Sequence, residues 1–292
     1  MDSALTSVGL PIALAIIMFG LGLGLTGADF RRVGQHPRAV VVALTCQLVL
    51  LPPVCFGLVL LFDLDPLLGI GMMLLAASPG GTTANLFSHV FRGDVALNIS
   101  LTAVNSIISI ATLPLITNLA INYFDQGDSV SMPMSEVLKV FALILIPVGI
   151  GMAVRAGRPA FALRMDRPVR IGSILILAVL VIAILVSERD TMGGSFADVG
   201  VVAGLFCAIS LGVGYFVPRA FDVVEDQAIA SSFEIGLHNC TLAIFVAENV
   251  LDSTDAAVPA AVYSIVMFFL AAAWGSLISR WVRQERVSSA AT

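Results

Sequence analysis

The chain has 292 residues, of which 58% are hydrophobic and only 12% charged, and its mean hydropathy is +1.00. Soluble domains carry roughly 25% charged residues, so this composition excludes an ordinary soluble protein and predicts a polytopic membrane protein. The net charge of −5 indicates no particular partner, because in a membrane protein the sign of each loop matters more than the total. We expect a lipid bilayer around the protein, no nucleic-acid partner and no requirement for an oligomer.

Apolar segments long enough to cross a bilayer follow one another along the whole chain. A helical span takes roughly twenty apolar residues, and nine segments meet that length. They lie at about 6–27, 38–62, 66–90, 94–123, 134–156, 168–187, 196–217, 226–248 and 255–279. Long continuous runs favour helices over a barrel, whose strands alternate over about ten residues. We therefore predict an all-α fold of about nine transmembrane helices with no soluble domain.

The basic residues are divided unevenly between the loops. Thirteen of the fifteen Lys and Arg residues fall on one side of the predicted membrane, among them Arg31, Arg158 and Arg280. The loops of the other side carry acidic residues such as Asp63 and Asp125. The positive-inside rule then places the N-terminus outside and the C-terminus in the cytoplasm, in a cell (inner) membrane.

The four cysteines, Cys46, Cys55, Cys207 and Cys240, all lie inside apolar segments. Neither a CxxC pair nor a Cys/His metal spacing accompanies them, so we interpret them as packed free thiols. The N-terminal apolar run lacks a positively charged leader and is too long for a typical signal peptide, which favours a membrane span.

Two of the predicted spans are interrupted by glycine and polar residues, one at 79–85 (PGGTTAN) and the other at 234–239 (EIGLHN). They would cross the membrane in opposite directions, each before one long helix. That pattern is typical of an inverted-repeat transporter with its site at the midplane. The alternative is that the glycines only permit close helix packing.

The run Pro79-Gly80-Gly81 predicts a true break in its helix, because proline removes a backbone donor and glycine holds a helix weakly. Carbonyl and amide groups freed at that depth need a partner, a water-lined cavity or an ion. The break is therefore either a binding crossover or a structural kink.

A polar stripe runs along the helix expected at 94–123. Asn98, Thr102, Asn105, Ser109 and Thr112 recur every three or four residues, which places them on one helical face. Hydroxyl-mediated packing would explain Ser109 and Thr112. The two asparagines favour an oxygen-rich lining.

Glu234 is the only carboxylate far from every predicted helix end. A charged side chain at that depth costs at least ~2.5 kcal/mol on insertion scales and usually faces a cavity or a partner. Neither Lys nor Arg occurs at its depth, so we expect its partner to be a bound cation, a proton or His238. Carboxylate, amide, hydroxyl and carbonyl oxygens are ligands of hard cations, which favours Na⁺.

Two further polar residues have open roles. His238 lies four residues after Glu234 and would share its face in an unbroken helix. It is either a proton site or a neutral ring that donates a hydrogen bond. Gln47, a lone amide ahead of an expected break at Pro52-Pro53, is either an interhelical hydrogen-bond donor or a ligand.

Together, PGGTTAN at 79–85, RGDVALNISLTAVNSIIS at 92–109 and EIGLHN at 234–239 resemble the bile acid:sodium symporter family. The resemblance covers about residues 6–280. It implies inverted repeats, two broken helices that cross, and core and panel domains. The core would comprise about 38–123 and 196–279, and the panel about 6–27 and 134–187. Family members usually have ten helices, so this chain looks like a version without the first panel helix.

The resemblance also implies the site residues. One Na⁺ site would be formed around Ala84, Asn85, Asn98, Thr102 and Glu234. A second would use Gln47, Glu234, His238 and the backbone near Ile235 and Leu237. Substrate contacts would come from Thr82, Thr83, Asn105 and Asn239. This chain departs from the pattern at three positions, since bacterial relatives have Ser at the positions of Ala84 and Asn98, and Gln at that of His238. The second site is the one these departures put in question, because a ring nitrogen binds Na⁺ poorly.

The sequence therefore predicts a transporter rather than an enzyme, coupling one or two Na⁺ to import of an organic anion, bile-acid-like or a small carboxylate, by alternating access. A proton-coupled or uncoupled carrier that uses Glu234 and His238 is the alternative. An intramembrane enzyme is a distant third hypothesis, because neither GxSxG nor HExxH occurs.

Overall fold

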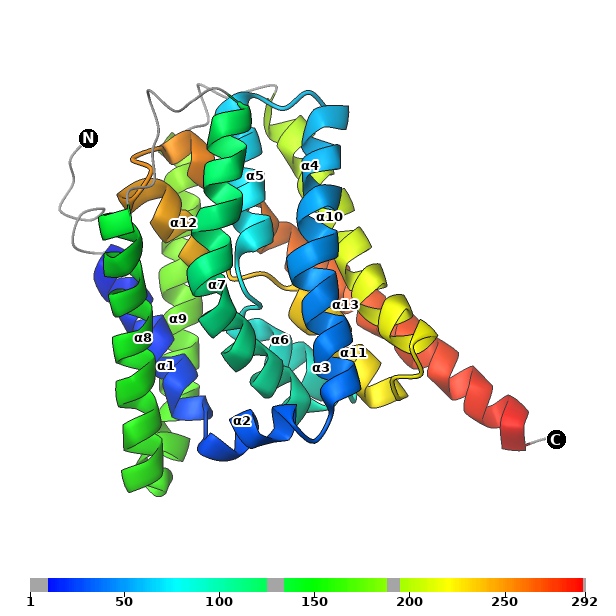
Figure 1. Ribbon diagram of the computed structural model, residues 1–292. Coiled ribbons are helices and arrows are strands. Elements are labelled where there is room, and N and C mark those ends of the chain that lie inside the picture. The colour runs from blue at the N-terminus through cyan, green and yellow to red at the C-terminus, as the bar shows by residue number, and fades with distance from the viewer. Residues whose placement is uncertain (1–9, 125–133, 188–194, 291–292) are drawn as a thin grey trace.

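The computed structural model describes residues 10–124, 134–187 and 195–290, and within these ranges every regular element is a helix (Figure 1). In chain order they are α1 (Leu10–Gly24), α2 (Gly27–Val33), α3 (Pro37–Thr45), a π-helical turn (Cys46–Leu50), α4 (Leu51–Leu61), α5 (Pro66–Ala77), α6 (Thr82–Val90), α7 (Val95–Tyr123), α8 (Met134–Gly157), α9 (Pro159–Ser187), α10 (Ser195–Ala220), α11 (Glu225–Gly236), α12 (Cys240–Asn249) and α13 (Thr254–Ala290). The all-α expectation is confirmed for the described residues.

Several of these helices are long and apolar enough to cross a membrane. Within the described ranges, four continuous spans meet the criterion, at Pro37–Leu61, Val95–Tyr123, Ala197–Ala220 and Thr254–Trp281. A bent pair, Leu14–Gly24 with Gly27–Val33, makes up to five. A polytopic membrane protein is thus supported, and the count of nine spans stays a prediction.

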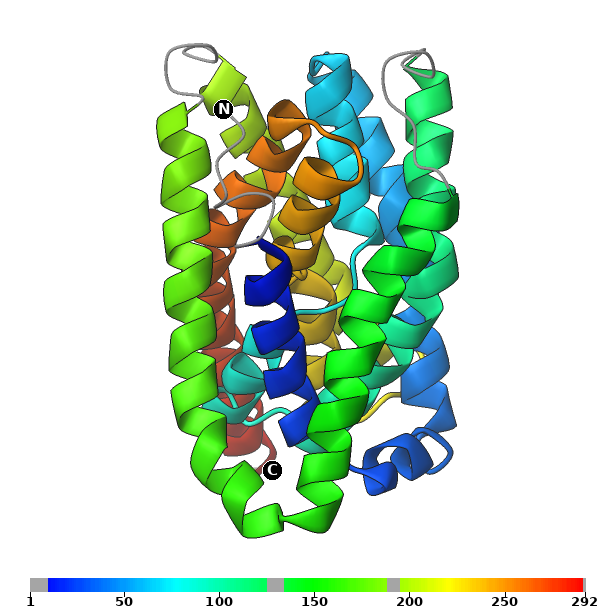
Figure 2. The ribbon, with the colours of Figure 1, turned by 90° about the vertical axis from the view of Figure 1, so that its left-hand side faces the viewer.

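Helices α1, α8 and α9 pack together on one side of the molecule (Figure 2). Small residues let α1 approach α8 closely. A Cβ on Gly22 would collide with the Val148 backbone, and one on Gly151 would collide with the carbonyl of Phe19. Because lipid is as apolar as the side chains, such close packing is a main source of helix association in a bilayer. The group coincides with the predicted panel, and the division into core and panel stays a prediction.

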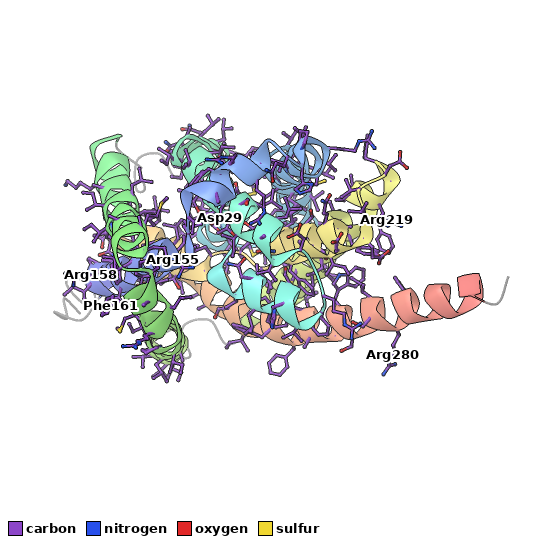
Figure 3. The ribbon with its side chains drawn as sticks, turned by 90° about the horizontal axis from the view of Figure 1, so that it is seen from below. Asp29, Arg155, Arg158, Phe161, Arg219 and Arg280 are labelled. Carbon is purple, nitrogen blue, oxygen red and sulfur yellow. The ribbon has the colours of Figure 1, made fainter. Side chains whose placement is uncertain are left out.

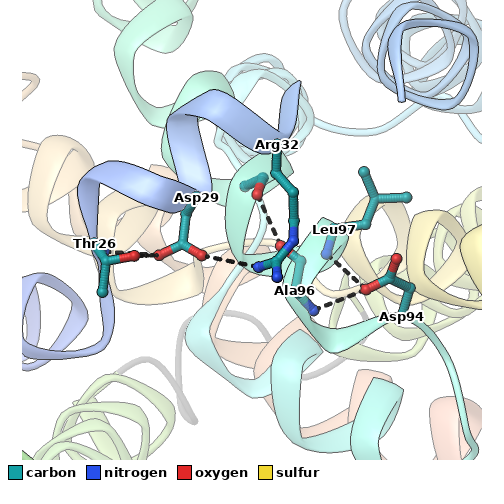
Figure 4. Close-up of polar contacts among 7 residues, drawn as sticks. Thr26, Asp29, Arg32, Asp94, Ala96 and Leu97 are labelled. Carbon is teal, nitrogen blue, oxygen red and sulfur yellow. Dashed lines mark hydrogen bonds and ion pairs between the residues drawn. The ribbon is translucent and has the colours of Figure 1, made fainter. Parts of the chain in front are cut away.

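The chain turns sharply by 74° between α1 and α2. The backbone N–H and the hydroxyl of Thr26 both donate to Oδ2 of Asp29 at 2.7 Å, and Arg32 pairs with Oδ1 at 3.5 Å (Figure 4). A carboxylate at this position binds the free N–H groups of a helix start. Helix α2 packs against α7, whose own first turn is capped by Asp94. The buried Asp29 therefore fixes the passage from α1 to the rest of the bundle.

The expected break at Pro52-Pro53 was wrong. The two prolines lie in the first turn of α4, directly after the π-helical turn, and the span Pro37–Leu61 is continuous. Proline lacks a backbone N–H, and the wider π turn supplies a helix end at which that donor is not needed.

Two helices are longer than their predicted spans. Helix α9 begins at Pro159 rather than at 168, and α13 extends to Ala290 rather than to 279. Hydropathy detects only the apolar part of a helix, whereas both extensions are rich in arginine, which favours helix formation.

The described arginines gather at one end of the bundle. Seen from below, Arg155, Arg158, Arg219 and Arg280 lie around the end that also carries α2 (Figure 3). This distribution agrees with the expected inner face, and the orientation itself stays a prediction. Asp125, one of the predicted outer acids, lies outside the described residues.

Candidate cation and substrate site

Two broken helices meet in the middle of the bundle. Helix α5 ends at Ala77 and α6 begins at Thr82, while α11 ends at Gly236 and α12 begins at Cys240. Figure 1 shows that the two pairs run in opposite directions, with α5 and α12 above and α6 and α11 below. Both interruptions predicted from the sequence are therefore true breaks rather than regular helix, and repeat symmetry stays a prediction.

The breaks are joined by their own backbones. Gly81 N–H donates to the carbonyl of Leu237 at 2.6 Å, and Asn239 N–H donates to the carbonyl of Pro79 at 2.8 Å. These two bonds form an antiparallel bridge between Gly80 and His238. Backbone groups freed at this depth thus find partners in each other, as a low-dielectric interior requires.

Glu234 lies beside this bridge and is only 1% exposed. Its Oε2 accepts a hydrogen bond from the Thr102 hydroxyl at 2.5 Å. Its Oε1 lies against Gly80 and has no well-formed hydrogen bond among the described residues. An ionised carboxylate buried without a full set of partners is costly, so the free oxygen favours a bound cation or proton.

Gly80 is required by this close approach. A Cβ at position 80 would overlap the carboxylate of Glu234. The glycine of the first break therefore makes room for the carboxylate of the second, which explains why a helix-weakening residue stands there.

Asn98 connects three helices below the bridge. Its Nδ2 donates to Ser88 Oγ on α6 at 2.9 Å and to the Ala230 carbonyl on α11 at 2.8 Å. The contacts Asn98–Ala230 and Thr102–Glu234 are one turn apart on both α7 and α11. The Oδ1 of Asn98 is buried and lacks a partner in the described structure, so an oxygen is left beside Glu234.

Helix α6 adds two more buried oxygens. Thr83 Oγ1 and Asn85 Oδ1 have no hydrogen-bond partner within the described ranges. Ala84 between them is fully buried and has only its backbone to offer. The side chain of Thr82 lies outside the described part. We call Asn85, Asn98, Thr102 and Glu234 the oxygen cluster.

A second group of residues near the bridge consists of hydrogen-bond donors. Gln47 Nε2 and His238 Nδ1 both approach the carbonyl of Ser78, at 3.4 and 3.3 Å. The His238 ring is 1% exposed and stacks on Phe206 with a centroid separation of 5.3 Å. Glu234 and His238 would share a helical face only in an unbroken helix, but α11 ends at Gly236, between them. The two side chains therefore have separate partners.

Residues that sequence reasoning missed complete this group of donors. The Gly236 carbonyl accepts from the Tyr263 hydroxyl at 2.9 Å and lies 3.6 Å from Cys207 Sγ. Ile235 is fully buried in the same turn. We call Gln47, Cys207, His238 and Tyr263 the donor cluster. No motif or residue spacing in the sequence predicts a role for Tyr263, because it is a single tyrosine in an apolar run.

The predicted substrate residues differ in their surroundings. Asn105 is 1% exposed, and neither atom of its amide has a partner in the described structure. Asn239 caps α12, because its Oδ1 accepts from Leu242 N–H at 3.1 Å. The hydroxyls of Ser109 and Thr112 bond carbonyls of their own helix, which fits packing rather than a lining.

The sequence also matches proteins of known family. It matches the family model described as the sodium bile acid symporter family over residues 11–195. It is 24% identical over 256 residues to the probable chloroplast sodium/metabolite cotransporter BASS2 of Oryza sativa subsp. japonica, covering 88% of this chain and 60% of that protein. The uncharacterized sodium-dependent transporter YocS of Bacillus subtilis is 25% identical over 254 residues, with 87% and 78% covered. The human ileal sodium/bile acid cotransporter is 24% identical over 241 residues, with 82% and 69% covered. These relatives are transporters rather than enzymes.

Proposed function

Because this chain belongs to the sodium bile acid symporter family, we propose that it is a secondary active symporter that uses Na⁺ to import an organic anion. The observation that carries the proposal is the oxygen cluster, a buried carboxylate bonded to Thr102 together with buried, unpartnered amide oxygens on the helices that pack around the two breaks. Oxygen ligands of this kind suit a hard cation. Unwound segments at the midplane are usual supports for Na⁺ in such folds.

The residues take distinct roles in this proposal. Glu234 supplies the charge that attracts Na⁺, and the amide oxygens of Asn85 and Asn98 and the Thr102 hydroxyl complete the cluster. Once Na⁺ neutralises Glu234, the crossover repels an anion less. Na⁺ and the anion then raise each other's affinity, as linkage requires.

The anion would lie next to the starts of α6 and α12, whose positive ends face the crossover. Asn105 offers an unpartnered amide there, and Thr83 an unpartnered hydroxyl. A bile-acid-like molecule or a small carboxylate, such as a keto acid or pantoate, fits this role. Movement of the group α1, α8 and α9 against the remaining helices would alternate access, with the arginine-rich end in the cytoplasm.

A second candidate is a carrier coupled to protons. The observation that favours it is the buried Nε2 of His238, which has no partner among the described residues. Uptake driven by a pH gradient in the absence of Na⁺ would support this candidate over the first.

The experiment uses purified protein in detergent and in liposomes. A panel of organic anions, including taurocholate and small carboxylates, is screened by thermal shift in NaCl and in choline chloride, since a ligand of the native state raises its stability by mass action. Any stabilising anion is then tested for uptake into liposomes with an inward Na⁺ gradient. We expect Na⁺-dependent stabilisation and uptake. Equal uptake in both salts would contradict Na⁺ coupling.

A further inference from the structure

The two clusters at the crossover offer opposite chemistry to a cation. The oxygen cluster presents acceptors without partners, whereas the donor cluster presents N–H, O–H and S–H groups that already point at carbonyl oxygens. An N–H group, such as those of Gln47 and His238, has no lone pair with which to coordinate a cation. The difference bears on how many cations the protein can hold.

Two carbonyl oxygens in the donor cluster, those of Ser78 and Gly236, each have two donors near them. A carbonyl has two lone pairs. Ser78 O is approached by Gln47 and His238, and Gly236 O by Tyr263 and Cys207. Leu237 O in the same break accepts the Gly81 N–H at 2.6 Å. A cation that used Ser78 O or Gly236 O would have to displace these donors.

The contact of His238 defines the state of its ring. The Ser78 carbonyl can only accept, so Nδ1 must carry the hydrogen of that contact. In the neutral ring Nε2 is then bare, and imidazole nitrogen suits transition metals rather than Na⁺. Phe206 on one face and Tyr263 at the edge, with centroids 5.3 and 5.6 Å away, hold the ring in place.

We propose that His238 stands in for a second coupling cation, and that the protein binds a single Na⁺, at the oxygen cluster. The Nδ1–H of His238 ties the break between α11 and α12 to the carbonyl of Ser78, the first residue of the break between α5 and α6. His238 is thus a positioning residue, since it holds the crossover in the form that binds Na⁺. This inference rests on the proposed Na⁺ coupling and adds its stoichiometry.

Equilibrium binding of radiolabelled Na⁺ to the purified full chain measures the stoichiometry without knowledge of the substrate. We expect saturation at one Na⁺ per chain with a Hill coefficient near one. Saturation at two, or a Hill coefficient clearly above one, would overturn the inference and leave Na⁺ coupling intact. Absence of saturable binding would instead overturn the proposed function together with the inference.

Two variants of His238 separate positioning from mere packing. His238→Phe keeps the stacked ring and loses the hydrogen bond, so one Na⁺ should still bind, roughly five- to tenfold more weakly. His238→Gln brings an amide oxygen to the same place, so a second, weaker Na⁺ should appear at high concentration. Unchanged affinity in the Phe variant, or a single Na⁺ in the Gln variant, would contradict the proposal. Elution volume and melting temperature without Na⁺ serve as controls for folding.

Discussion

The oxygen cluster and the donor cluster meet at one backbone bridge, yet they are opposite in chemistry. The bridge itself is nearly symmetric, because each break donates one N–H to a carbonyl of the other. The side chains break that symmetry. Glu234 and two asparagines leave acceptors free in one cluster, while Gln47 and Tyr263 donate to backbone carbonyls in the other. Crossing helices therefore provide a frame, and the side chains decide where a cation can bind.

The largest effect is expected from Glu234→Gln, which keeps the size of the side chain and removes its charge. Na⁺ affinity should fall by at least about a hundredfold, because the neutral amide cannot compensate a buried cation. Radiolabelled Na⁺ binding measures the loss. Retained binding within a few fold of the wild type would move the site away from the oxygen cluster.

Gly80→Ala should have the next largest effect on Na⁺ affinity, because its new Cβ would overlap the Glu234 carboxylate. Crowding of this kind costs about 1–3 kcal/mol, and we expect a roughly thirtyfold weaker Na⁺ affinity. Gly212→Ala is the matched control, because nothing lies within 4 Å of its Cβ position. Equal Na⁺ affinities in the two variants would show that the contact between Gly80 and Glu234 is unimportant.

Thr102→Val preserves the shape of the side chain and removes its hydrogen bond to Glu234. A hydrogen bond to a charged group contributes about 1.5–3 kcal/mol, so Na⁺ should bind roughly tenfold or more weakly. Thr112→Val is the control on the same helix, because the Thr112 hydroxyl bonds only the carbonyl of Ile108 in the described structure. A Na⁺ affinity shared by both variants would exclude Thr102 from the oxygen cluster.

The smallest effect on Na⁺ affinity is expected in the donor cluster, from Tyr263→Phe. Loss of the hydrogen bond to Gly236 should weaken Na⁺ binding only about three- to fivefold, because Tyr263 acts through the shape of the break. Tyr123→Phe, a change at an exposed ring, should leave it unaltered. A loss of Na⁺ affinity as large as that of Glu234→Gln would mean that the donor cluster itself coordinates Na⁺.

Much of this arrangement is predictable from the sequence, because a carboxylate or a glycine pair in a long apolar run is unusual. Both breaks and the buried face of α7 from Asn98 to Ser109 lie where the pattern predicts. Helical periodicity and hydropathy describe a few turns of the chain at a time, so they can reveal local features such as these.

Partnerships across the fold are the part that the sequence hides. Thr102 and Glu234 are 132 residues apart, and Tyr263 reaches a carbonyl 27 residues away. Ser78 accepts a hydrogen bond from Gln47, and Ser88 accepts one from Asn98, and both donors lie on other helices. The expected break at Pro52-Pro53 failed for a related reason, since the preceding π turn is invisible to hydropathy.

That π turn has a consequence for the length of its segment. Each residue of an α-helix advances the side-chain direction by about 100°, and a π turn absorbs one residue more than an α turn. Deleting one residue from Cys46–Leu50 would therefore restore ordinary winding and leave the relative orientation of α3 and α4 nearly unchanged. Gln47 lies inside this turn, so the deletion would act mainly on its contact with the Ser78 carbonyl, although hydropathy and span length would hardly change. The extra residue thus serves the placement of Gln47 rather than the path of the membrane span.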